Sequence, residues 1–221
     1  MNVQVVNGLG ATNGYPVNPE ELSPDLTATN GLGNLIIGYN ELGNPTGDNR
    51  TGSHNLIVGL ENNVEGFGGT SIGHRNRATS AYSSVAGGTN NTASGMFSSI
   101  SGGKSGLASG WGSAISGGNG GTASGQSSSI TGGQLNIASG LRSVVAGGGS
   151  NQARAEESVV VGGGHAFNQA EGNICDGTRS VVVGGSANHT SGGGHTSVVG
   201  GGFGIETIGS YDWAAGSLYE P

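Results

Sequence analysis

The sequence predicts an all-β fold in which short coils stack into a parallel β-roll or β-solenoid, and two observations carry this prediction. Glycine supplies 49 of the 221 residues, which is roughly three times its usual share of about 7%. Pairs of glycines also recur every 15 residues, beginning at residues 87, 102, 117, 132, 147 and 162. This period is too short for a helical hairpin or a propeller blade, with periods of about 34 and 40–45 residues, and it suits one solenoid coil.

Each 15-residue unit is interpreted as two short strands joined by two turns. One copy, SSVAGGTNNTASGMF, begins at Ser83. Within it, S-x-V-x predicts the first strand, GG-x-x a turn, N-x-A-S the second strand and G-x-x the turn back. Glycine favours such turns because it adopts positive φ without a steric penalty from a Cβ atom. We therefore expect every copy to form one two-strand coil.

The repeats divide the chain into three parts. Looser copies begin at Asn34 and Asn55, and the repeat pattern extends over residues 34–209, which we count as about eleven coils. Insertions near residues 41–52 and 168–179 are expected to project as loops, and the second contains Cys175. Residues 1–33 are expected to cap the N-terminal coil, and residues 210–221 are expected to cap the C-terminal coil.

Equivalent positions of successive copies predict two columns of side chains inside the stack, because stacked coils lie about 4.8 Å apart. The column of small side chains contains Ala93, Ala108, Ala123, Ala138 and Ala153. The column of large side chains contains Val85, Ile100, Ile115, Ile130, Val145, Val160, Val182 and Val198. A large column facing a small one is expected in a narrow interior that holds little more than one layer of side chains.

The residues next to the large column predict an oligomer. They alternate to the opposite face of the first strand, yet they are small or apolar, and the later copies read VVV at Val159 and at Val181. A strand that is apolar on both faces is typical of a strand buried on both sides. Since the sequence predicts no helix to cover it, we expect the same strand of neighbouring copies to do so, in a parallel homotrimer.

The motif S-[SV]-[VI]-x-G-G-x-x-N-x-A-S-G resembles the head repeats of YadA-like trimeric autotransporter adhesins, over roughly residues 34–209. It also resembles uncharacterised bacterial surface proteins with the same repeats. The resemblance implies a left-handed parallel β-roll, three chains around a common axis, and a head that binds host or surface ligands. It also implies an extracellular or cell-surface location, although the first residues lack the charged and apolar regions of a signal peptide.

Variable turn positions form the candidate contact surface for a host protein or glycan. The turn after each A-S-G varies most, and a solenoid presents such positions as a row. The candidate contact residues are Met96, Lys104, Trp111, Leu141 and Arg142. The alternative is that these side chains pack against a neighbouring chain or are merely tolerated at the surface.

Large apolar side chains near the C-terminus form a second candidate surface: Tyr211, Trp213, Leu218 and Tyr219. We expect them to cover the last coil. If they are instead exposed and adhesive, copies would associate end to end.

Composition and motifs argue against several other functions. The chain has 7 Lys and Arg against 14 Asp and Glu, so we expect no nucleic-acid partner. No apolar stretch approaches the 18 or so residues of a membrane span. His165, His189 and His195 lack a recognised ligand spacing and are expected to be surface residues, so neither a metal nor another cofactor is predicted. No catalytic arrangement stands out, and a non-enzymatic protein is expected.

Three functions share this predicted scaffold. The first is an adhesive or receptor-binding head, and the second is a building block of an extracellular filament or coat. The third is a segment of a phage-type fibre. Ligand binding at the turns would favour the first, and end-to-end filaments would favour the second.

Overall fold

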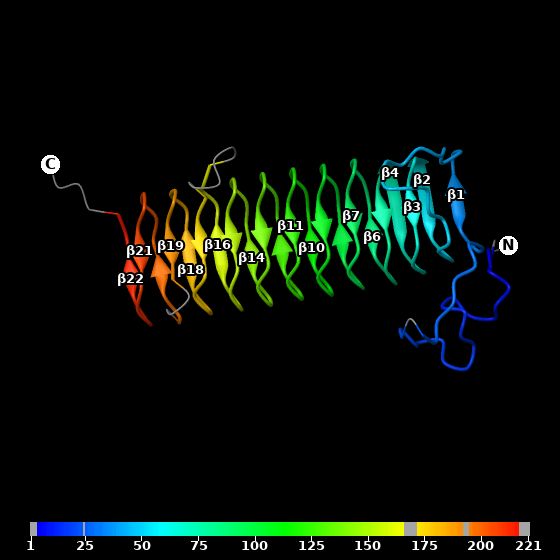
Figure 1. Cartoon of the computed structure of the whole chain (residues 1–221), viewed down its shortest axis with the longest axis horizontal. Coiled ribbons are helices and arrows are strands. Elements are labelled where there is room, and N and C mark those ends of the chain that lie inside the picture. Colours follow the sequence, from blue (N-terminus) through cyan, green and yellow to red (C-terminus); the bar gives the residue numbers. More distant parts are fainter. Residues whose placement is uncertain (1–3, 24, 166–171, 192–194, 217–221) are drawn as a thin grey trace. The chain divides into compact units, whose positions relative to one another are not determined.

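The computed structural model describes residues 4–23, 25–165, 172–191 and 195–216. It contains two compact units, Met1–Ala108 and Ser109–Pro221, and each is described by itself. The described residues form strands and turns without any helix, and all the strand pairs are parallel. Each unit is a stack of coils that forms a β-solenoid, with one strand of each coil in a first sheet and the other in a second sheet (Figure 1).

The first unit begins with β1 at the edge of its first sheet. The strands of this sheet, in order, are β1 (Leu35–Ile37), β2 (Leu56–Leu60), β4 (Thr70–His74), β6 (Ser84–Val85) and β8 (Ser99–Ile100). The second sheet contains β3 (Asn63–Val64), β5 (Arg77–Ala78), β7 (Thr92–Ala93) and β9 (Leu107–Ala108).

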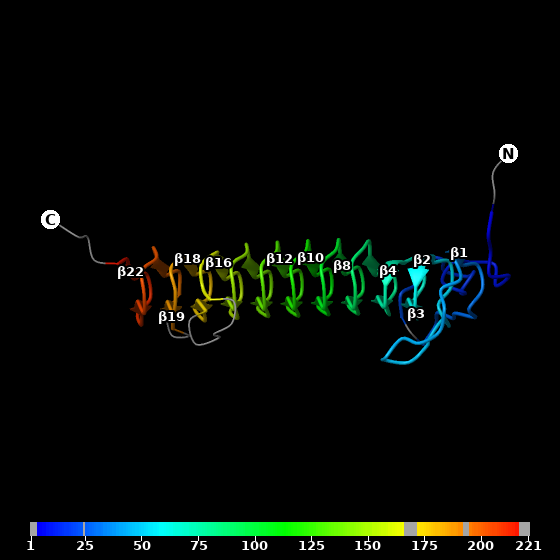
Figure 2. The ribbon, with the colours of Figure 1, turned by 90° about the horizontal axis from the view of Figure 1, so that it is seen from above.

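The second unit repeats this arrangement, and the view from above separates its two sheets (Figure 2). Its first sheet contains β10 (Ala114–Ile115), β12 (Ser129–Ile130), β14 (Val144–Val145), β16 (Val159–Val161), β18 (Val181–Val183), β20 (Val198–Val199) and β22 (Trp213–Ala214). Its second sheet contains β11 (Thr122–Ala123), β13 (Ile137–Ala138), β15 (Gln152–Ala153), β17 (Ile174–Cys175), β19 (His189–Thr190) and β21 (Glu206–Thr207). Four second-sheet strands in the first unit and six in the second give ten complete coils, where the sequence predicted about eleven.

The interior of each unit consists of two columns of buried side chains. Seven residues of the predicted large column are 0 to 1% exposed: Val85, Ile100, Ile115, Ile130, Val145, Val160 and Val182. Across the interior, the small column is also buried, from Ala93 to Ala153. Parallel in-register pairing produces these columns, because Ile115 pairs with Ile130 and Ala123 pairs with Ala138.

Val198 was wrongly assigned to the buried column. Strand β18 pairs Val181 with Val198 and Val182 with Val199, so Val199 occupies the interior position and is 0% exposed. In the copy that begins at Ser197, three consecutive glycines follow the two valines. Alignment on the first two of them shifted the register by one residue, and in a strand such a shift exchanges the inner and outer faces.

The second insertion also differs from its predicted bounds. Cys175 lies in β17 and pairs with Ala153, which places it in the small interior column rather than in a loop. Because Ala153 pairs with Cys175, the residues that exceed the 15-residue period fall between Gly164 and Gly172. Part of this stretch lies outside the described ranges. The segment NICDGTRS that begins at Asn173 is a diverged copy of N-x-A-S-G-x-x-S.

Buried asparagines form a ladder of hydrogen bonds at one turn of the coils. In the second unit, Asn136 Nδ2 donates to the carbonyl oxygens of Gly132 and Gly148, at 2.8 and 3.1 Å. Its Oδ1 accepts from the backbone N–H of Asn151, at 3.0 Å. Each asparagine therefore satisfies backbone groups of its own coil and of the next one, which buried peptide groups require.

Gly121 interrupts this ladder in the second unit. It occupies the asparagine position and provides no side-chain acceptor for the N–H of Asn136. A Cβ built on Gly121 would meet Ile130 at 3.5 Å, which is ordinary contact, and its φ lies outside the positive region. An asparagine therefore fits at this position and restores the missing hydrogen bonds.

We expect Gly121→Asn to stabilise the protein by about 1–3 kcal/mol, since each net hydrogen bond is worth about 0.5–1.5 kcal/mol and loss of a flexible glycine adds to this. Urea unfolding followed by circular dichroism measures the change. Gly117→Asn is the matched control, because a Cβ there faces open space. An equal change in both variants would contradict the ladder as the cause.

Each coil has two turns, which are named here after their sequences. The GG turn follows a first-sheet strand, as at residues 86–90, and the SG turn follows a second-sheet strand, as at residues 94–97. Positive φ is not confined to glycine, because Asn90 in a GG turn has φ 57° and Phe97 in an SG turn has φ 59°. The N–H of each donates to a carbonyl of the preceding coil, His74 and Ala81 respectively. These bonds hold varied side chains in the left-handed conformation.

The N-terminal segment lies against the turns of the first unit. Asn30 N–H donates to Ser53 Oγ at 3.0 Å, and Gly31 N–H donates to the Thr51 carbonyl at 2.9 Å. The edge strand β1 stays exposed, since Leu35, Ile36 and Ile37 are 50, 44 and 55% exposed. The described part of residues 1–33 thus leaves the side chains of the first strand open.

Candidate functional site

The SG turns present two rows of side chains, and they hold most of the predicted contact residues. Within the second unit, Trp111 and Leu141 occupy equivalent positions and are 51 and 37% exposed. Arg142 occupies the left-handed position, with φ 55°. In the first unit, Met96 is half-buried in the corresponding turn after β7. The repeat therefore predicts the placement of these four residues correctly.

Lys104 does not lie beside Met96. It follows β8 and forms a bridge with Thr89, which places it in a GG turn, whereas Met96 lies in an SG turn. The two turns lie at opposite ends of the short strands, so Lys104 is exposed on a different edge of the first unit. The proximity of the two in sequence suggested a common patch that the coil geometry excludes.

Arg142 makes ion pairs with the next SG turn. Its Nη2 lies 2.8 Å from Glu156 Oε1 and 2.9 Å from Glu157 Oε1. Glu157 in turn contacts Arg179, at 3.3 Å. These side chains are exposed, so the pairs are worth at most about 1 kcal/mol each. They neutralise the charges of these SG turns, and Trp111 and Leu141 are among the large apolar side chains that the turns of this unit expose.

An aromatic stack in the first unit was not predicted from the sequence. The rings of Tyr82 and Phe97 are parallel within 8° with centroids 5.4 Å apart. Phe67 meets Tyr82 edge to face at 5.3 Å. The sequence could have indicated this stack, because Tyr82 and Phe97 occupy equivalent positions in successive SG turns. Stacked coils bring equivalent side chains together.

The predicted C-terminal cap is placed differently. Trp213 pairs with Val198 in the first sheet, points to its outer face and is 73% exposed. Tyr211 occupies an SG turn and is 80% exposed. Neither side chain covers the last coil, whose interior lies on the other side of the sheet. Leu218 and Tyr219 lie outside the described residues.

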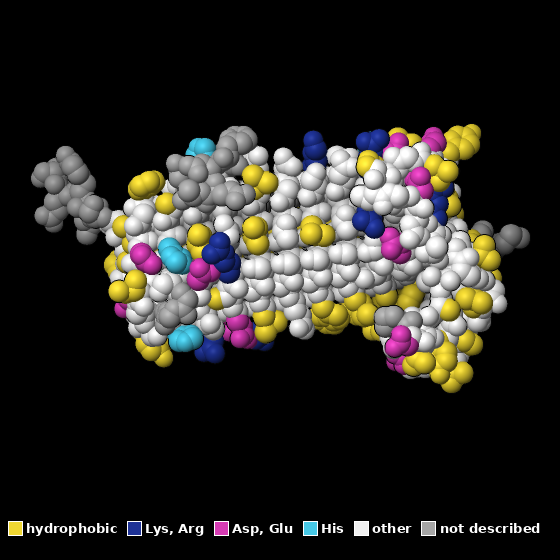
Figure 3. Space-filling model, in the orientation of Figure 1, with side chains coloured by type: hydrophobic (Ala, Val, Ile, Leu, Met, Phe, Trp, Pro, Cys, Tyr) yellow, Lys and Arg dark blue, Asp and Glu magenta, His cyan; other side chains and the backbone are white. Residues whose placement is uncertain are grey.

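Charged side chains gather on the outer face of the second sheet in the second unit, over β17, β19 and β21 (Figure 3). His189 Nε2 lies 3.1 Å from Asp176, and its Nδ1 lies 3.4 Å from Glu206. Arg154 contacts the same oxygen of Asp176 at 3.3 Å. This network ties four successive coils together, those of β15, β17, β19 and β21. His165 and His195 are exposed, and the described ranges hold no group of three or more His, Cys, Asp or Glu suited to a metal ion.

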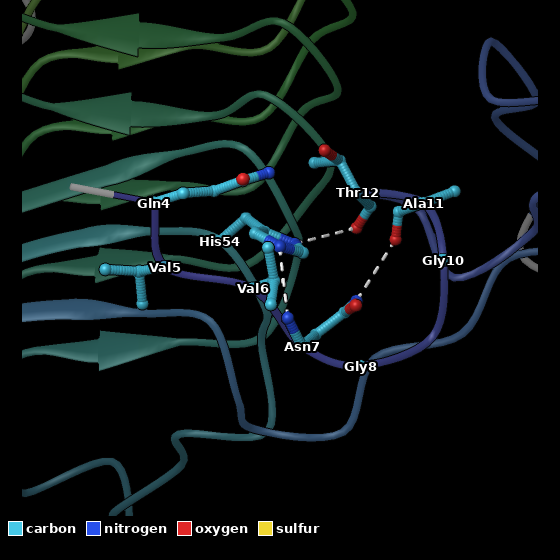
Figure 4. A pocket seen from close by; sticks show the side chains of 9 residues that line it. All are labelled: Gln4, Val5, Val6, Asn7, Gly8, Gly10, Ala11, Thr12 and His54. Carbon is cyan, nitrogen blue, oxygen red and sulfur yellow. Dashed lines mark hydrogen bonds between the residues drawn. The ribbon is translucent and has the colours of Figure 1, made fainter. Parts of the chain in front are cut away.

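A pocket in the first unit surrounds His54, with a volume of about 570 Å³ (Figure 4). Its other walls come from residues 4–8 and 10–12. The N–H of Asn7 donates to His54 Nε2 at 3.2 Å, and His54 Nδ1 lies 3.3 Å from the Thr12 carbonyl. Because Nε2 accepts from Asn7, Nδ1 is the ring nitrogen placed to donate to the Thr12 carbonyl. Both ring nitrogens therefore hold the N-terminal loop in place, and His54 acts as a structural link.

A smaller groove of about 260 Å³ lies between Leu22, Thr27 and Thr29 on one side and the SG turns of the first unit on the other. Phe67, Ala81 and Met96 provide its apolar surface. Thr29, Thr79 and Glu65 contribute polar groups. The groove thus combines the predicted contact residue Met96 with side chains that the repeat pattern did not single out.

Cys175 is the single cysteine of the chain, and it is buried in the small column of the second unit. Thr190 Oγ1 donates to its sulfur at 3.2 Å, and the thiol donates to the Ser180 carbonyl at 3.1 Å. Burial raises the pKa of the Cys175 thiol above its ordinary value. Since the thiolate is the reactive form, Cys175 is held in an unreactive state.

We expect Cys175 in the folded protein to react with Ellman's reagent at least about a hundredfold more slowly than a free cysteine, because it is buried and protonated. Labelling kinetics with and without urea measure this protection. The matched control is Ser139→Cys in a Cys175→Ala background, since Ser139 is exposed beside the same sheet. Equal rates for the two proteins would contradict the burial of Cys175.

No helix of the described residues is long and apolar enough to cross a bilayer. Comparison with protein-family models gives no match for the chain, and comparison with curated proteins gives none either. The function is therefore argued from the coils and their surfaces.

Proposed function

We propose that the protein is a non-enzymatic structural and adhesive component of an extracellular or cell-surface assembly. In this proposal, three copies pack through the outer faces of their first sheets and present their turns outward for a host or surface ligand. The observation that carries the proposal is the absence of charge from the outer face of the first sheet in the second unit. Its two columns contain Ala114, Ser129, Val144, Val159, Val181, Val198 and Trp213, and Ser116, Thr131, Ala146, Val161, Val183 and Gly200.

This face is uncharged and partly exposed in the single chain, and its later strands are apolar. Val161 and Val183 are 43 and 44% exposed, and Trp213 extends the column to the last strand of the sheet. Contiguous exposed apolar surface is typical of an interaction site. The small and β-branched side chains also make the face flat enough for close approach of another sheet.

The second sheet of the same unit provides the contrast. Its outer face carries Arg154, Asp176, His189 and Glu206, which form ion pairs with one another. Charged groups of this kind are depleted from the centres of stable interfaces. The first sheet is therefore the face that a neighbouring copy would cover, and the second sheet would face solvent.

The number of copies and the adhesive role are supported by the resemblance of the repeats to YadA-like adhesin heads. That resemblance covers the S-[SV]-[VI]-x-G-G-x-x-N-x-A-S-G units, which are the coils that present the apolar face. Three identical faces around one axis bury one another without leaving an open edge, as closed cyclic symmetry requires.

Val161→Lys tests the assembly. The change places a charge at the centre of the proposed interface, and we expect it to reduce the mass in solution from about 64.5 kDa, three times the chain mass of 21.5 kDa, to that of one chain. Analytical ultracentrifugation measures the mass, and circular dichroism checks that the coils remain folded.

Ser139→Lys is the control for this experiment, because Ser139 is exposed on the outer side of the second sheet. It is expected to retain the mass of the wild-type protein. If Val161→Lys also retains that mass, the first sheet is not the interface and the proposal fails.

Association end to end is a second candidate, favoured by the open edge strand β1. Its three apolar side chains are exposed, and one side of its backbone has no neighbouring strand in the sheet order of the first unit. Exposed apolar edges pair readily with other strands. Electron microscopy distinguishes the two forms, since filaments would show this association and isolated short particles would exclude it.

A further inference from the structure

The groove between Leu22, Thr27 and Thr29 and the SG turns of the first unit has the chemistry of a binding site for a small neutral ligand. Its volume of about 260 Å³ is just below the range of about 300–1,000 Å³ typical of sites for drug-sized molecules. The apolar surface is contributed by the half-buried Leu22 and Met96. Behind them lie Phe67 and Ala81, which are 4 and 9% exposed. A ligand in the groove would therefore contact apolar atoms on one side.

Polar groups line the rest of the groove. Thr29 and Thr79 provide hydroxyl groups, which both donate and accept hydrogen bonds. Glu65 provides a carboxylate, of which Oε1 lies 3.1 Å from Arg77 Nη2. This ion pair balances the charge of Glu65, and the lining contains no lysine or arginine. The groove is thus suited to hydroxyl groups rather than to a phosphate or a carboxylate.

The segment that forms the wall is held in place before any ligand binds. Thr27 N–H and Oγ1 both donate to the Ser23 carbonyl, at 3.0 and 3.1 Å. The N–H of Ala28 donates to the Asn13 carbonyl at 2.8 Å. A preformed wall reduces the entropy lost on binding, which improves the affinity of a small ligand.

We propose that this groove binds a neutral saccharide, with the apolar face of a sugar ring against Phe67, Ala81 and Met96 and its hydroxyl groups toward Thr29, Thr79 and Glu65. A pyranose ring has an apolar face of C–H groups and a rim of hydroxyls, which matches this division. The inference rests on the proposed adhesive function and names the class of ligand for it.

Met96 provides a direct probe, because the chain contains only two methionines. Protein labelled with ¹³C at the methionine methyl groups is titrated with neutral tetrasaccharides of glucose, galactose, mannose or N-acetylglucosamine, and Met96→Leu assigns the signals. We expect at least one tetrasaccharide to shift the Met96 methyl resonance in a saturable manner. A collagen-like peptide and inorganic phosphate are titrated in parallel and are expected to leave it unchanged.

Thr79→Val removes one hydroxyl with little change of shape, and we expect it to weaken saccharide binding about three- to tenfold, equivalent to one hydrogen bond. Thr122→Val, on the outer face of the second sheet of the second unit, is the matched control and is expected to bind as the wild type does. The absence of any saccharide shift, equal affinity in Thr79→Val, or a shift with the peptide or phosphate alone would overturn the proposal.

The mass of the same samples in solution distinguishes failure of the saccharide proposal from failure of the proposed trimeric assembly. A trimer without a saccharide response would overturn the groove assignment alone. A monomer that still binds the saccharide would overturn the trimeric assembly while leaving the groove assignment intact.

Discussion

Replacement of Ile115 by aspartate is expected to abolish cooperative folding or to lower the Tm by more than about 10 °C. Ile115 is 1% exposed and pairs in register with Ile130 in the large column. The change removes a buried branched side chain, which costs about 2–5 kcal/mol, and it introduces a carboxylate without a partner. Thermal unfolding followed by circular dichroism measures the effect.

Ser124→Asp is the control for Ile115→Asp, because it introduces the same charge at an exposed position after β11. We expect its Tm to stay within a few degrees of the wild type, as for most surface changes. A Tm for Ile115→Asp equal to that of Ser124→Asp would show that the column is not the core.

Gly133→Ala is expected to destabilise the second unit strongly, whereas Gly132→Ala is not. Gly133 has φ 87°, and a Cβ there would lie 2.1 Å from the carbonyl oxygen of Gly148 in the next coil. The left-handed conformation alone costs about 1–2 kcal/mol for alanine, and the contact forces the coils apart. We expect the Tm to fall by about 5–10 °C, measured by calorimetry.

The adjacent glycine gives a matched comparison. A Cβ on Gly132 meets no atom within 4 Å, and its φ is not positive. Alanine at this position is expected to be neutral or to stabilise by up to about 1 kcal/mol, because it restricts the unfolded chain. Similar losses in both variants would contradict the close approach of coils at Gly133.

The coil itself could be predicted from the sequence because each copy repeats the same local signals. The glycine pairs mark the GG turns, and the Val or Ile positions and the alanines mark the interior columns from Val85 to Val182. These features depend on residues within one copy and on its nearest neighbours, which is what a solenoid uses for stability. The period therefore carried most of the information about the fold.

Errors arose where a copy departs from the pattern. Three consecutive glycines after Val199 left two possible registers, and the wrong one placed Val198 inside. Cys175 was assigned to an insertion because a cysteine replaces the usual alanine and the segment before it is longer. In both cases, pairing with the neighbouring strand decides the position, and one copy alone does not specify it.

The contacts of the candidate sites were less predictable than the fold. The sequence indicated that SG turns vary, but Lys104 was grouped with them because it lies close to Met96 in the chain. The groove depends on the packing of Leu22, Thr27 and Thr29 near Phe67 and Ala81, and no repeat relates these N-terminal residues to the turns. The buried asparagine ladder was also missed, because the asparagine of N-x-A-S was interpreted only as the first residue of the second strand.

The mass of the wild-type protein in solution tests the central claim, that the charge-free face of the first sheet is covered by sister chains. Sedimentation equilibrium over a range of concentrations is expected to give about 64.5 kDa, three times the 21.5 kDa chain mass. A stable folded species of 21.5 kDa at all concentrations would show that Val161, Val183 and Trp213 remain in water, and it would contradict the account.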